Sequence, residues 1–568
     1  MKFLAPFLAC FALAACSAGT DTGTAAPSGQ ASGSAGTAAD FIPDIPAQSI
    51  EAHIRFLASD YLQGRDVGTD GYEIAANYVA AQMRLLGLEP AGDDDSYFQS
   101  VPLQDVTTDT SYDSFMIDGE PAEVGRQVVF AANPNLLESE VTAPLVFVGF
   151  GVSAPNRDHD DYADIDATGK IVVLIEGVPD GFPSEERAHH ASSATKRDVA
   201  AAHGAVGMII LNDMDDDAIE RFATGSSALP RTRLTAASGP SSYDEVTVTA
   251  DVGTTIAEQI FAGAPMSFQE AEAAMKAEDG ASFPHFDLPH TVTMRQRTLS
   301  EPFSAPNVVG MIRGTDPELA GEVVVLSAHL DHIGTVHDGM RGGGACRSSD
   351  EADSVCNGAV DNASGVSIML ETARTFLQQG APRRSVLFIA LAGEEKGLLG
   401  SEHFARNPTV PLDSIVANVN LDMPVIVYEF SDVVAFGAEH SNLGPIAARA
   451  AARMNIGVSP DPIPEQSIFV RSDHYNFVRQ GIPSIFLMTG FSSPDPRWDE
   501  GEGFMGFLNT HYHRQTDQLD GELEVLFDQG AKFANINYLI AREIADSDER
   551  PAWNEGDFFG ELYGHTAE

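Results

Sequence analysis

Residues 322–331 read EVVVLSAHLD, and residues 385–395 read SVLFIALAGEE. Each stretch is an apolar run of the length of one buried strand, and each ends in charged or imidazole side chains. Between them, residues 364–377 have apolar positions three and four apart, which is typical of an amphipathic helix. Strands that alternate with helices favour an α/β sheet with helices on its faces.

The same alternation extends along the chain in both directions. Residues 50–57 and 72–88 have the pattern of helices, and residues 414–421 and 482–488 have the pattern of buried strands. Residues 520–546 have apolar positions spaced three and four apart, which predicts a closing helix.

One part of the chain departs from this rhythm. Short β-rich runs between residues 145 and 211 are separated by acidic loops. We therefore expect an insert domain at 136–289 within a discontinuous first domain of residues 46–135 and 290–548, followed by a C-terminal tail at 549–568. A length of 568 residues allows about two to four domains.

The N-terminus has the features of a targeting segment. Lys2 precedes an apolar run at residues 3–13 that is too short to span a bilayer. Residues 13–16 read LAAC, which resembles the lipobox of bacterial lipoproteins. On this interpretation residues 1–15 are a signal peptide and Cys16 carries the lipid; the alternative is an ordinary signal peptide that is cut nearby. Both interpretations predict an exported protein.

The segment after Cys16 is expected to be a flexible tether. Residues 16–45 begin with a long stretch rich in Ser, Gly, Thr and Ala. Ser17 and Ala18 give no Asp retention signal. By resemblance to bacterial lipoproteins, we expect a lipid-anchored protein on the periplasmic side of the outer membrane of a Gram-negative-type bacterium.

The charge of the chain is strongly acidic. It has 33 Lys and Arg against 83 Asp and Glu, a formal net charge of −50. A nucleic-acid-binding surface needs clustered cations to neutralise phosphates, so no nucleic-acid partner is expected. Membrane contact is expected only through the lipid at Cys16, and the acidity itself favours solubility.

Five groups of acidic and imidazole side chains lie at the ends of expected strands or in the loops that follow. Open α/β sheets place their binding sites at these positions. Taken singly, each group has an ordinary structural explanation, such as a helix cap. The groups are His329 with Asp331, Asp361 of DNASG, Glu394 with Glu395, Asp422 of NLDM, and His511 with His513.

Together these side chains supply two imidazoles, three carboxylates and a spare glutamate. This set suits two zinc ions, with one carboxylate bridging them and one position open for water. A neighbouring glutamate then accepts a proton from the water and returns it to the leaving amine, which is the chemistry of peptide hydrolysis. Calcium is a poorer match, because imidazoles are weak ligands for a hard cation.

The ordered motifs HLD, DNASG, GEE, NLDM and YH resemble the co-catalytic dizinc aminopeptidases, a family that includes bacterial leucyl aminopeptidases, aminopeptidase Y and glutamate carboxypeptidase II. The resemblance covers residues 46–135 and 290–548. It implies a mixed central sheet flanked by helices on both faces. The insert, through GFGV at 149–152, resembles a β-rich protease-associated domain.

The resemblance also implies a ligand set for two zinc ions per chain. Asp361 would bridge the two ions. His329 and Asp422 would complete one zinc site, and Glu395 and His513 would complete the other.

Three further roles follow from the same resemblance. Glu394 would be the general base and acid, Asp331 would orient His329, and Tyr512 would donate a hydrogen bond to the tetrahedral oxyanion. His513 is preferred to His511 as the ligand because the family places an Asp four residues after it.

Asp517 stands at that spacing from His513. His511 and His332 are then expected to be bystanders or rim residues. The Ser472-Asp473-His474 trio is expected to shape the pocket, since the sequence has no nucleophile elbow for a serine triad.

Only Cys346 and Cys356 remain outside the expected signal peptide and lipid site. They are ten residues apart in a Gly- and Asp-rich loop, and in an oxidising compartment a local disulfide is the simplest interpretation. The loop at 334–355 lengthens the usual run between His329 and Asp361 and is expected to form part of the cleft rim.

The leading hypothesis is an exported metallopeptidase that removes N-terminal residues from peptides. A carboxypeptidase or dipeptidase on the same metal site is the second hypothesis. A non-catalytic receptor-like binding protein is the third, and it would require lost ligands, whereas all five stand here. Glutaminyl cyclisation, which a relative performs, typically uses one zinc ion.

Overall fold

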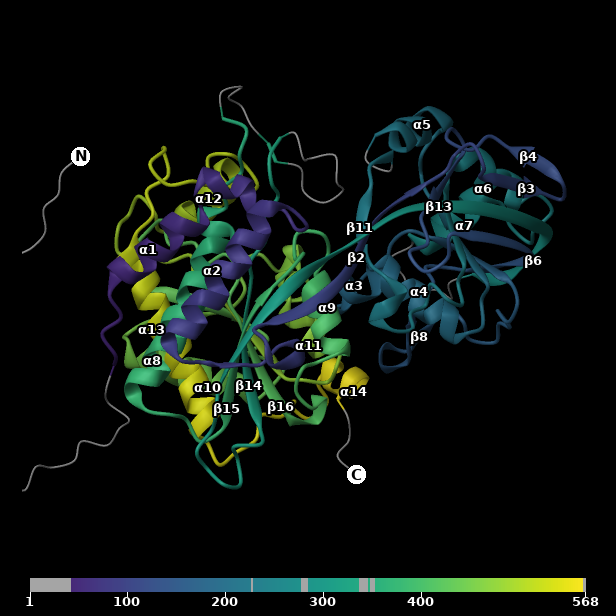
Figure 1. Cartoon of the computed structure of the whole chain (residues 1–568). Helices are drawn as coiled ribbons and strands as arrows, with labels where there is room; N and C mark the ends of the chain where they lie inside the picture. Colours follow the sequence, from purple (N-terminus) through teal and green to yellow (C-terminus); the bar gives the residue numbers. More distant parts are fainter. Residues whose placement is uncertain (1–41, 226–227, 277–283, 337–345, 348–352, 565–568) are drawn as a thin grey trace, which may run out of the picture. The chain divides into compact units, whose positions relative to one another are not determined.

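The computed structural model describes residues 42–225, 228–276, 284–336, 346–347 and 353–564. The expected signal peptide, Cys16 and the expected tether up to residue 41 lie outside the described residues. The described chain forms two lobes, each built around its own β-sheet (Figure 1). One long strand, β13 (His285–Ile312), contributes to both sheets.

The larger lobe contains the mixed sheet that the sequence predicts. Its strands lie in the order β2, β13, β15, β14, β16, β19, β17 and β18, with β1 beside the end of β13. Strands β15, β14, β16 and β19 are parallel to one another. β13 pairs antiparallel with β15, and β17 pairs antiparallel with β19. The bounds are β1 (Glu89–Pro90), β2 (Phe98–Thr108), β14 (Val323–His329), β15 (Ser385–Leu391), β16 (Ile415–Asn420), β17 (Asp432–Phe436), β18 (Gly457–Ser459) and β19 (Ser484–Thr489).

Both faces of this sheet are buried, which explains the continuous apolar runs of its strands. In β14, Val324, Leu326 and Ala328 point into one core, and Val323 and Val325 point into the core on the opposite face. The first core is covered by α1, α2, α8, α10 and α13, and the second by α9 and α11 (Figure 1). The α/β architecture with helices on both faces is therefore confirmed.

The helices begin and end close to the expected positions, with one exception. The helix expected from residue 520 begins only at Phe527, because the backbone N–H of Leu526 instead binds the carbonyl of Ile426 at 2.8 Å. The bounds are α1 (Ala47–Leu57), α2 (Asp70–Leu86), α8 (Gly365–Gln379), α9 (Leu399–Arg406), α10 (Leu443–Arg453), α11 (His474–Val478), α12 (Glu502–Thr510), α13 (Phe527–Asp546) and α14 (Phe558–Tyr563).

The smaller lobe is the β-rich insert. Its sheet has the strand order β4, β3, β13, β6, β9, β10, β12 and β5. Hydrophobic cores lie on both of its faces. The main bounds are β3 (Ser114–Ile117), β4 (Glu120–Ala122), β5 (Val128–Ala131), β6 (Glu138–Val148), β9 (Ile171–Ile175), β10 (Gly207–Leu211), β12 (Val248–Val252), α3 (Ser184–Ala191), α4 (Ser193–Ala202), α5 (Asp216–Thr224), α6 (Thr254–Ile260) and α7 (Phe268–Met275); β11 (Arg231–Leu234) pairs instead with β2.

The structure places two domain limits differently from the sequence expectation. The insert was expected to start at residue 136, but Phe115 and Phe130 already belong to its core. The residues after 548 were expected to be a tail, but Phe558 and Phe559 pack into the core of the larger lobe. In both cases the apolar residues stand in short segments that lack a long periodic run.

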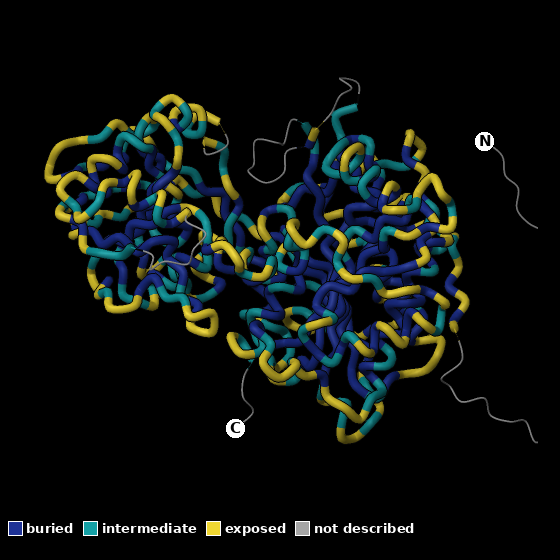
Figure 2. Tube along the Cα trace, turned by 180° about the vertical axis from the view of Figure 1, so that it is seen from behind, coloured by how far each residue is buried: buried dark blue, intermediate teal, exposed yellow. Residues whose placement is uncertain are grey.

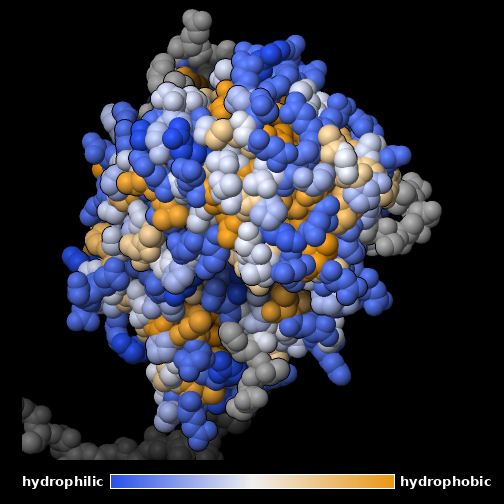
Figure 3. Space-filling view, turned by 90° about the vertical axis from the view of Figure 1, so that its right-hand side faces the viewer, coloured by the Kyte–Doolittle hydropathy of each residue, from blue (hydrophilic) through white to orange (hydrophobic). Residues whose placement is uncertain are grey.

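Burial and surface character follow the usual division. Buried segments gather in the interior of each lobe, and exposed turns lie at the periphery (Figure 2). On the face shown in Figure 3, hydrophilic side chains predominate and hydrophobic ones form small groups. Among the described residues, no helix has the length and apolar character needed to cross a bilayer.

Candidate metal centre and active site

The predicted site residues meet at one edge of the large sheet. His329 is the last residue of β14, Glu394 and Glu395 follow β15, and Asp422 follows β16. These three strands are parallel, so their carboxyl ends lie at the same edge. Asp361 reaches the same place from the helical turn that precedes α8.

Asp361 stands between two groups of possible metal ligands. Its Oδ1 lies 3.2 Å from Nε2 of His329, and its Oδ2 lies 3.3 Å from Nε2 of His513. The two oxygens of one carboxylate therefore face different imidazoles, an arrangement that can bridge two cations.

The first group joins Asp361 to His329 and Asp422. Nε2 of His329 lies 3.0 Å from Oδ1 of Asp422. The other ring nitrogen, Nδ1, lies 3.2 Å from the backbone carbonyl of Asp331. Because a carbonyl only accepts, Nδ1 donates this hydrogen bond, which leaves Nε2 as the ring nitrogen that faces the carboxylates.

The second group joins Asp361 to Glu395 and His513, and it includes a residue that was expected at the rim. Nε2 of His513 lies 3.2 Å from Oε2 of Glu395. Nδ1 of His332 lies 2.8 Å from Oε1 of Glu395 and 3.9 Å from Oδ2 of Asp361. His332 is completely buried, so it belongs to the interior of the site.

Asp331 is in the site, but its carboxylate does not contact His329 in the expected way. Its Oδ1 is 4.0 Å from Nδ1 of His329, which is too long for a hydrogen bond. Instead its two oxygens accept the backbone N–H groups of Glu394 at 3.1 Å and Glu395 at 3.2 Å. Asp331 therefore fixes the turn that carries the glutamate pair.

Two other polar side chains fix the segments that carry the ligands. Asp517 accepts the backbone N–H groups of Val360 at 2.9 Å and Asp361 at 3.0 Å. Asn362 donates to the carbonyl of Leu421 at 2.9 Å and accepts the N–H of Met423 at 3.1 Å. Asn362 also donates to the carbonyl of His329 at 3.3 Å, so the end of β14 and the loop after β16 are joined to the turn of Asp361.

The electrostatics of the site are dominated by crowded carboxylates. Burial, together with the charges of Asp422 and Glu395, raises the pKa of Glu394 well above its usual range. Burial also raises the pKa of Asp473 to about 7. Burial acts in the same direction on Glu395, but the imidazoles of His513 and His332 outweigh it and lower the pKa of Glu395 to about 2.

The residues present fit two zinc ions. Zinc binds nitrogen and oxygen donors at about 2.0–2.2 Å, which places two donors of a tetrahedral set about 3.3 Å apart. The donor pairs around Asp361 are 3.0–3.3 Å apart. Cations between them would also relieve the repulsion among the carboxylates.

A pocket of about 240 Å³ opens beside this cluster. Six of the site residues line it, namely His329, Asp361, Glu394, Asp422, Tyr512 and His513. The remaining wall is mostly apolar and is formed by Met423, Ile463, Ile468, Phe486, Met488, Phe504 and Leu508, with Gln466, Arg471 and Ser472 as polar members.

Tyr512 lines the pocket and lies against His513, with their ring centroids 3.9 Å apart and their planes tilted by 31°. Burial first, and then the charges of Asp361 and Glu395, raise the pKa of Tyr512 far above its ordinary value. The phenol therefore keeps its proton and is available as a hydrogen-bond donor to a bound molecule.

Sequence reasoning placed His332 at the rim and Ser472 in the pocket wall, and it gave Arg65 no role in the site. His332 stands next to the HLD motif, but its side-chain direction depends on the turn after β14. Ser472 donates to Oδ2 of Asp422 at 2.6 Å, which is more specific than the expected pocket-shaping role. Arg65 is buried and donates to the carbonyls of Leu330 at 2.9 Å and Asn357 at 2.6 Å.

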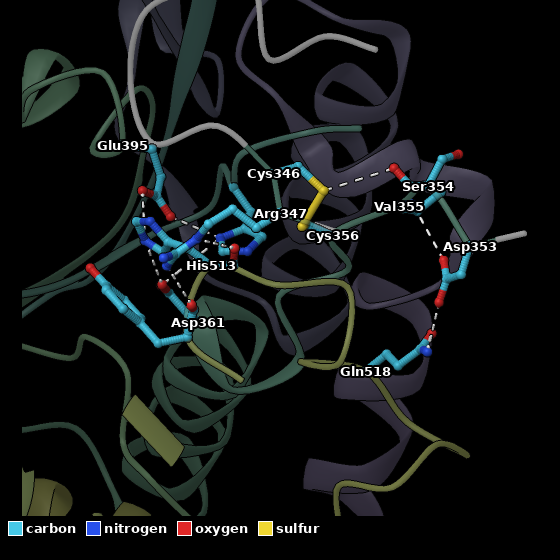
Figure 4. The surroundings of a disulfide bond; sticks show 12 residues. Cys346, Arg347, Asp353, Ser354, Val355, Cys356, Asp361, Glu395, His513 and Gln518 are labelled. Atoms are coloured by element: carbon cyan, nitrogen blue, oxygen red, sulfur yellow. Dashed lines mark hydrogen bonds and ion pairs between the residues drawn. A yellow bond between two sulfur atoms is a disulfide. The ribbon is translucent and has the colours of Figure 1, made fainter. Parts of the chain in front are cut away.

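The Cys346–Cys356 disulfide is present, and it lies beside the second ligand group (Figure 4). The disulfide closes the loop that separates the HLD and DNASG motifs. Its described residues lie close to the backbone of Tyr512 and His513.

Comparison with known proteins supports the same family. Residues 307–528 match the profile of Peptidase family M28, and residues 141–245 match the profile of the PA domain. The protein named "Probable lipoprotein aminopeptidase LpqL" from Mycobacterium tuberculosis is 24% identical over 470 residues, which cover 80% of this chain and 76% of that protein.

"Aminopeptidase YwaD" from Bacillus subtilis is 32% identical over 166 residues, 29% of this chain and 33% of that protein. Among solved structures, "Aminopeptidase from Aneurinibacillus sp. strain AM-1" has 20% sequence identity and a TM-score of 0.45, covering 89% of this chain and 95% of that chain. The chain therefore carries a region that matches peptidase family M28 together with an inserted PA domain, and it is a metallopeptidase.

Proposed function

We propose that this chain is an exported aminopeptidase that hydrolyses N-terminal residues from peptides with two zinc ions and Glu394 as the general base. The observation that carries the proposal is the position of Asp361. Its two oxygens face separate donor groups, 3.2 Å from His329 and 3.3 Å from His513, at the edge of a pocket that Glu394 also lines.

His329 and Asp422 would hold one ion, Glu395 and His513 would hold the other, and Asp361 would contact both. Zinc bound in this way supplies a Lewis acid for the scissile carbonyl and lowers the pKa of the attacking water.

The side chains of the protein then perform the proton transfers. Glu394 takes a proton from the attacking water and delivers it to the leaving amine. Asp331 keeps the Glu394 backbone in place through the hydrogen bond described above. The Tyr512 hydroxyl donates to the oxyanion as negative charge develops on the carbonyl oxygen.

The pocket indicates how a substrate would be accommodated. Its volume of about 240 Å³ is below the range of about 300–1,000 Å³ that is usual for pockets that hold drug-sized ligands. An apolar pocket of this size suits one large uncharged side chain rather than a long stretch of peptide. This supports removal of single terminal residues.

A carboxypeptidase or dipeptidase is the second candidate, and one observation favours it. Arg471 is among the residues that line the pocket. A guanidinium can bind a carboxylate with two hydrogen bonds, and the C-terminus of a peptide is such a carboxylate.

The experiment that separates the two uses one peptide in free and N-acetylated form, with the products identified by mass spectrometry. We expect the free peptide to lose residues from its N-terminus and the acetylated peptide to remain intact. Removal of C-terminal residues from the acetylated peptide would contradict the aminopeptidase proposal and support the second candidate.

We also propose export and lipid attachment at Cys16, with the protein on the periplasmic side of the outer membrane. The LAAC sequence at residues 13–16 supports this, as does the word lipoprotein in the name of the mycobacterial relative. In a bacterial host, Cys16→Ser is expected to move the full chain from the membrane fraction to the soluble exported fraction. An unchanged distribution would contradict attachment at Cys16.

A further inference from the structure

The loop between the HLD and DNASG motifs is closed at its base by several interactions. The disulfide joins Cys346 to Cys356. The N–H of Cys356 donates to the carbonyl of Gly334 at 3.0 Å, and the N–H of Val336 donates to the carbonyl of Ser354 at 2.9 Å. Both half-cystines are buried, so the base of the loop is part of the folded lobe.

Arg347 follows the first half-cystine and contacts the segment that supplies a metal ligand. Its Nη2 donates to the carbonyl of Tyr512 at 3.1 Å, and its Nε donates to the carbonyl of His513 at 3.4 Å. The backbone carbonyl of Arg347 accepts the N–H of Gln515 at 3.3 Å. Figure 4 shows the Arg347 side chain close to His513 and the disulfide.

A second contact joins the same loop to this segment further along the chain. Oδ2 of Asp353 accepts Nε2 of Gln518 at 2.9 Å, and its Oδ1 accepts the N–H of Val355 at 3.3 Å (Figure 4). Gln518 directly follows Asp517, whose carboxylate binds the backbone N–H of Asp361. The loop therefore contacts residues 512–518 at both ends, through Arg347 at His513 and through Asp353 at Gln518.

The segment needs such support because it lies outside regular structure. His513 comes after the end of α12 and has a φ of +56°, in the left-handed region that non-glycine residues rarely adopt. A residue in this conformation persists when its surroundings hold it there. Among the described residues, Arg347 binds the carbonyl of His513 with both its backbone N–H and its side chain.

We infer that the disulfide-closed loop positions His513 for metal binding, and that Arg347 is the positioning residue through which it acts. The inference rests on the two-zinc site of the proposed function. It concerns one half of that site, because the described contacts of Arg347 are with the segment of Tyr512 and His513 and not with His329 or Asp422.

The test measures zinc release from purified full-length protein into a chromogenic chelator. The variants are Arg347→Ala, Arg347→Lys and the double change Cys346→Ala with Cys356→Ala. Arg313→Ala is the control, since Arg313 is an exposed arginine that pairs with Glu89 on the opposite edge of the sheet from the pocket residues. Cysteine substitution replaces chemical reduction, because added thiols would bind zinc themselves.

We expect wild-type protein and the control to release two zinc ions per chain at distinguishable rates. Arg347→Ala is expected to speed one phase about 10- to 100-fold and leave the other unchanged, which is the usual effect of losing a residue that orients a ligand. The double cysteine variant should speed the same phase. Arg347→Lys should give an intermediate rate, because it keeps one donor and loses the planar fork.

The same variants should lower kcat more than they raise KM, because the apolar pocket wall is unchanged. Both zinc ions leaving Arg347→Ala at wild-type rates would overturn the inference, and so would equal acceleration of both phases. If the double cysteine variant does not fold, the Arg347→Ala variant still decides the question, because the side chain that it removes is exposed. Wild-type protein that binds fewer than two zinc ions would instead contradict the proposed function.

Discussion

Asp361 is the residue on which both ligand groups depend. Its carboxylate reaches His329 on one side and His513 on the other. Its backbone N–H is held by Asp517, and Asn362 next to it joins the loops after β14 and β16. The direction of this carboxylate is therefore set by the backbone of the site.

Replacing this carboxylate should affect both ions together. We expect Asp361→Ala to lose both zinc ions after dialysis and to have no measurable hydrolysis, because one change removes a ligand from each ion. Zinc per chain, measured by elemental analysis, is the readout. Asp520→Ala serves as the control, since Asp520 is an exposed acid paired with Arg55. Retention of two zinc ions by Asp361→Ala would show that Asp361 does not bridge them.

At the residue scale the sequence predicts which residues lie together in the site, but it does not predict the direction of each side chain or its hydrogen-bond partners. The eight predicted site residues lie around the cluster and its pocket because motifs at strand ends are brought to one edge by parallel pairing. The direction of a side chain after a strand depends on the turn that follows. For that reason His332 was expected at the rim but contacts Glu395, and Asp331 was expected to orient His329 but binds the backbone of Glu394.

At the scale of elements, the buried parallel strands were the easiest to predict. β14 and β15 send alternate residues into two cores, so each contains a continuous apolar run, at residues 323–326 and 386–391. β13 was harder because Pro289, Pro302 and Pro306 interrupt it and resemble a linker. It is nevertheless a 28-residue strand that contributes to both sheets. For that reason no break in the strand marks the expected domain boundary at residue 290.

The insert is also joined to the large lobe by an ion-paired histidine. Nε2 of His440 lies 2.7 Å from Oε2 of Glu185 on α3, and its Nδ1 lies 2.5 Å from Oδ2 of Asp557. Burial alone would lower the pKa of His440, but the hydrogen bonds to Asp557 and Glu185 outweigh it. They raise the pKa of His440 from 6.5 to about 10. The stabilisation from this contact therefore requires a protonated imidazole.

The direction of the pH effect follows from the raised pKa. The contribution is complete below pH 6.5 and is lost as the pH rises toward 10. We therefore expect the difference in Tm between wild-type protein and His440→Gln to be largest near pH 6 and to shrink toward pH 10. Thermal unfolding of both proteins across this range is the measurement. A difference that stays constant with pH would contradict the charged contact.

At the scale of the whole molecule, the net charge of −50 acts over long distances. A few carboxylates have a place in the site and several others, such as Asp161 and Glu371, are buried, whereas the exposed ones give the surface its negative charge. Such a surface attracts cationic peptides and raises their rate of encounter, and salt screens the effect.

Salt should therefore affect cationic and neutral substrates differently. We compare two peptides with the same N-terminal residue, one with lysines and one with glutamines further along. Between about 20 and 500 mM NaCl, kcat/KM for the lysine peptide is expected to fall several-fold, and the value for the glutamine peptide to change by less than about twofold. Equal salt responses would show that the overall charge does not steer substrates.

The most direct test of the central claim is the Glu394→Gln variant, measured for zinc content and for hydrolysis in the same preparation. Glutamine keeps the size of the side chain and removes its ability to accept the proton. We predict two zinc ions per chain, as in the wild-type protein, with kcat lower by about 10²- to 10⁴-fold. Wild-type turnover in this variant would contradict Glu394 as the base, and loss of zinc would make Glu394 a ligand instead.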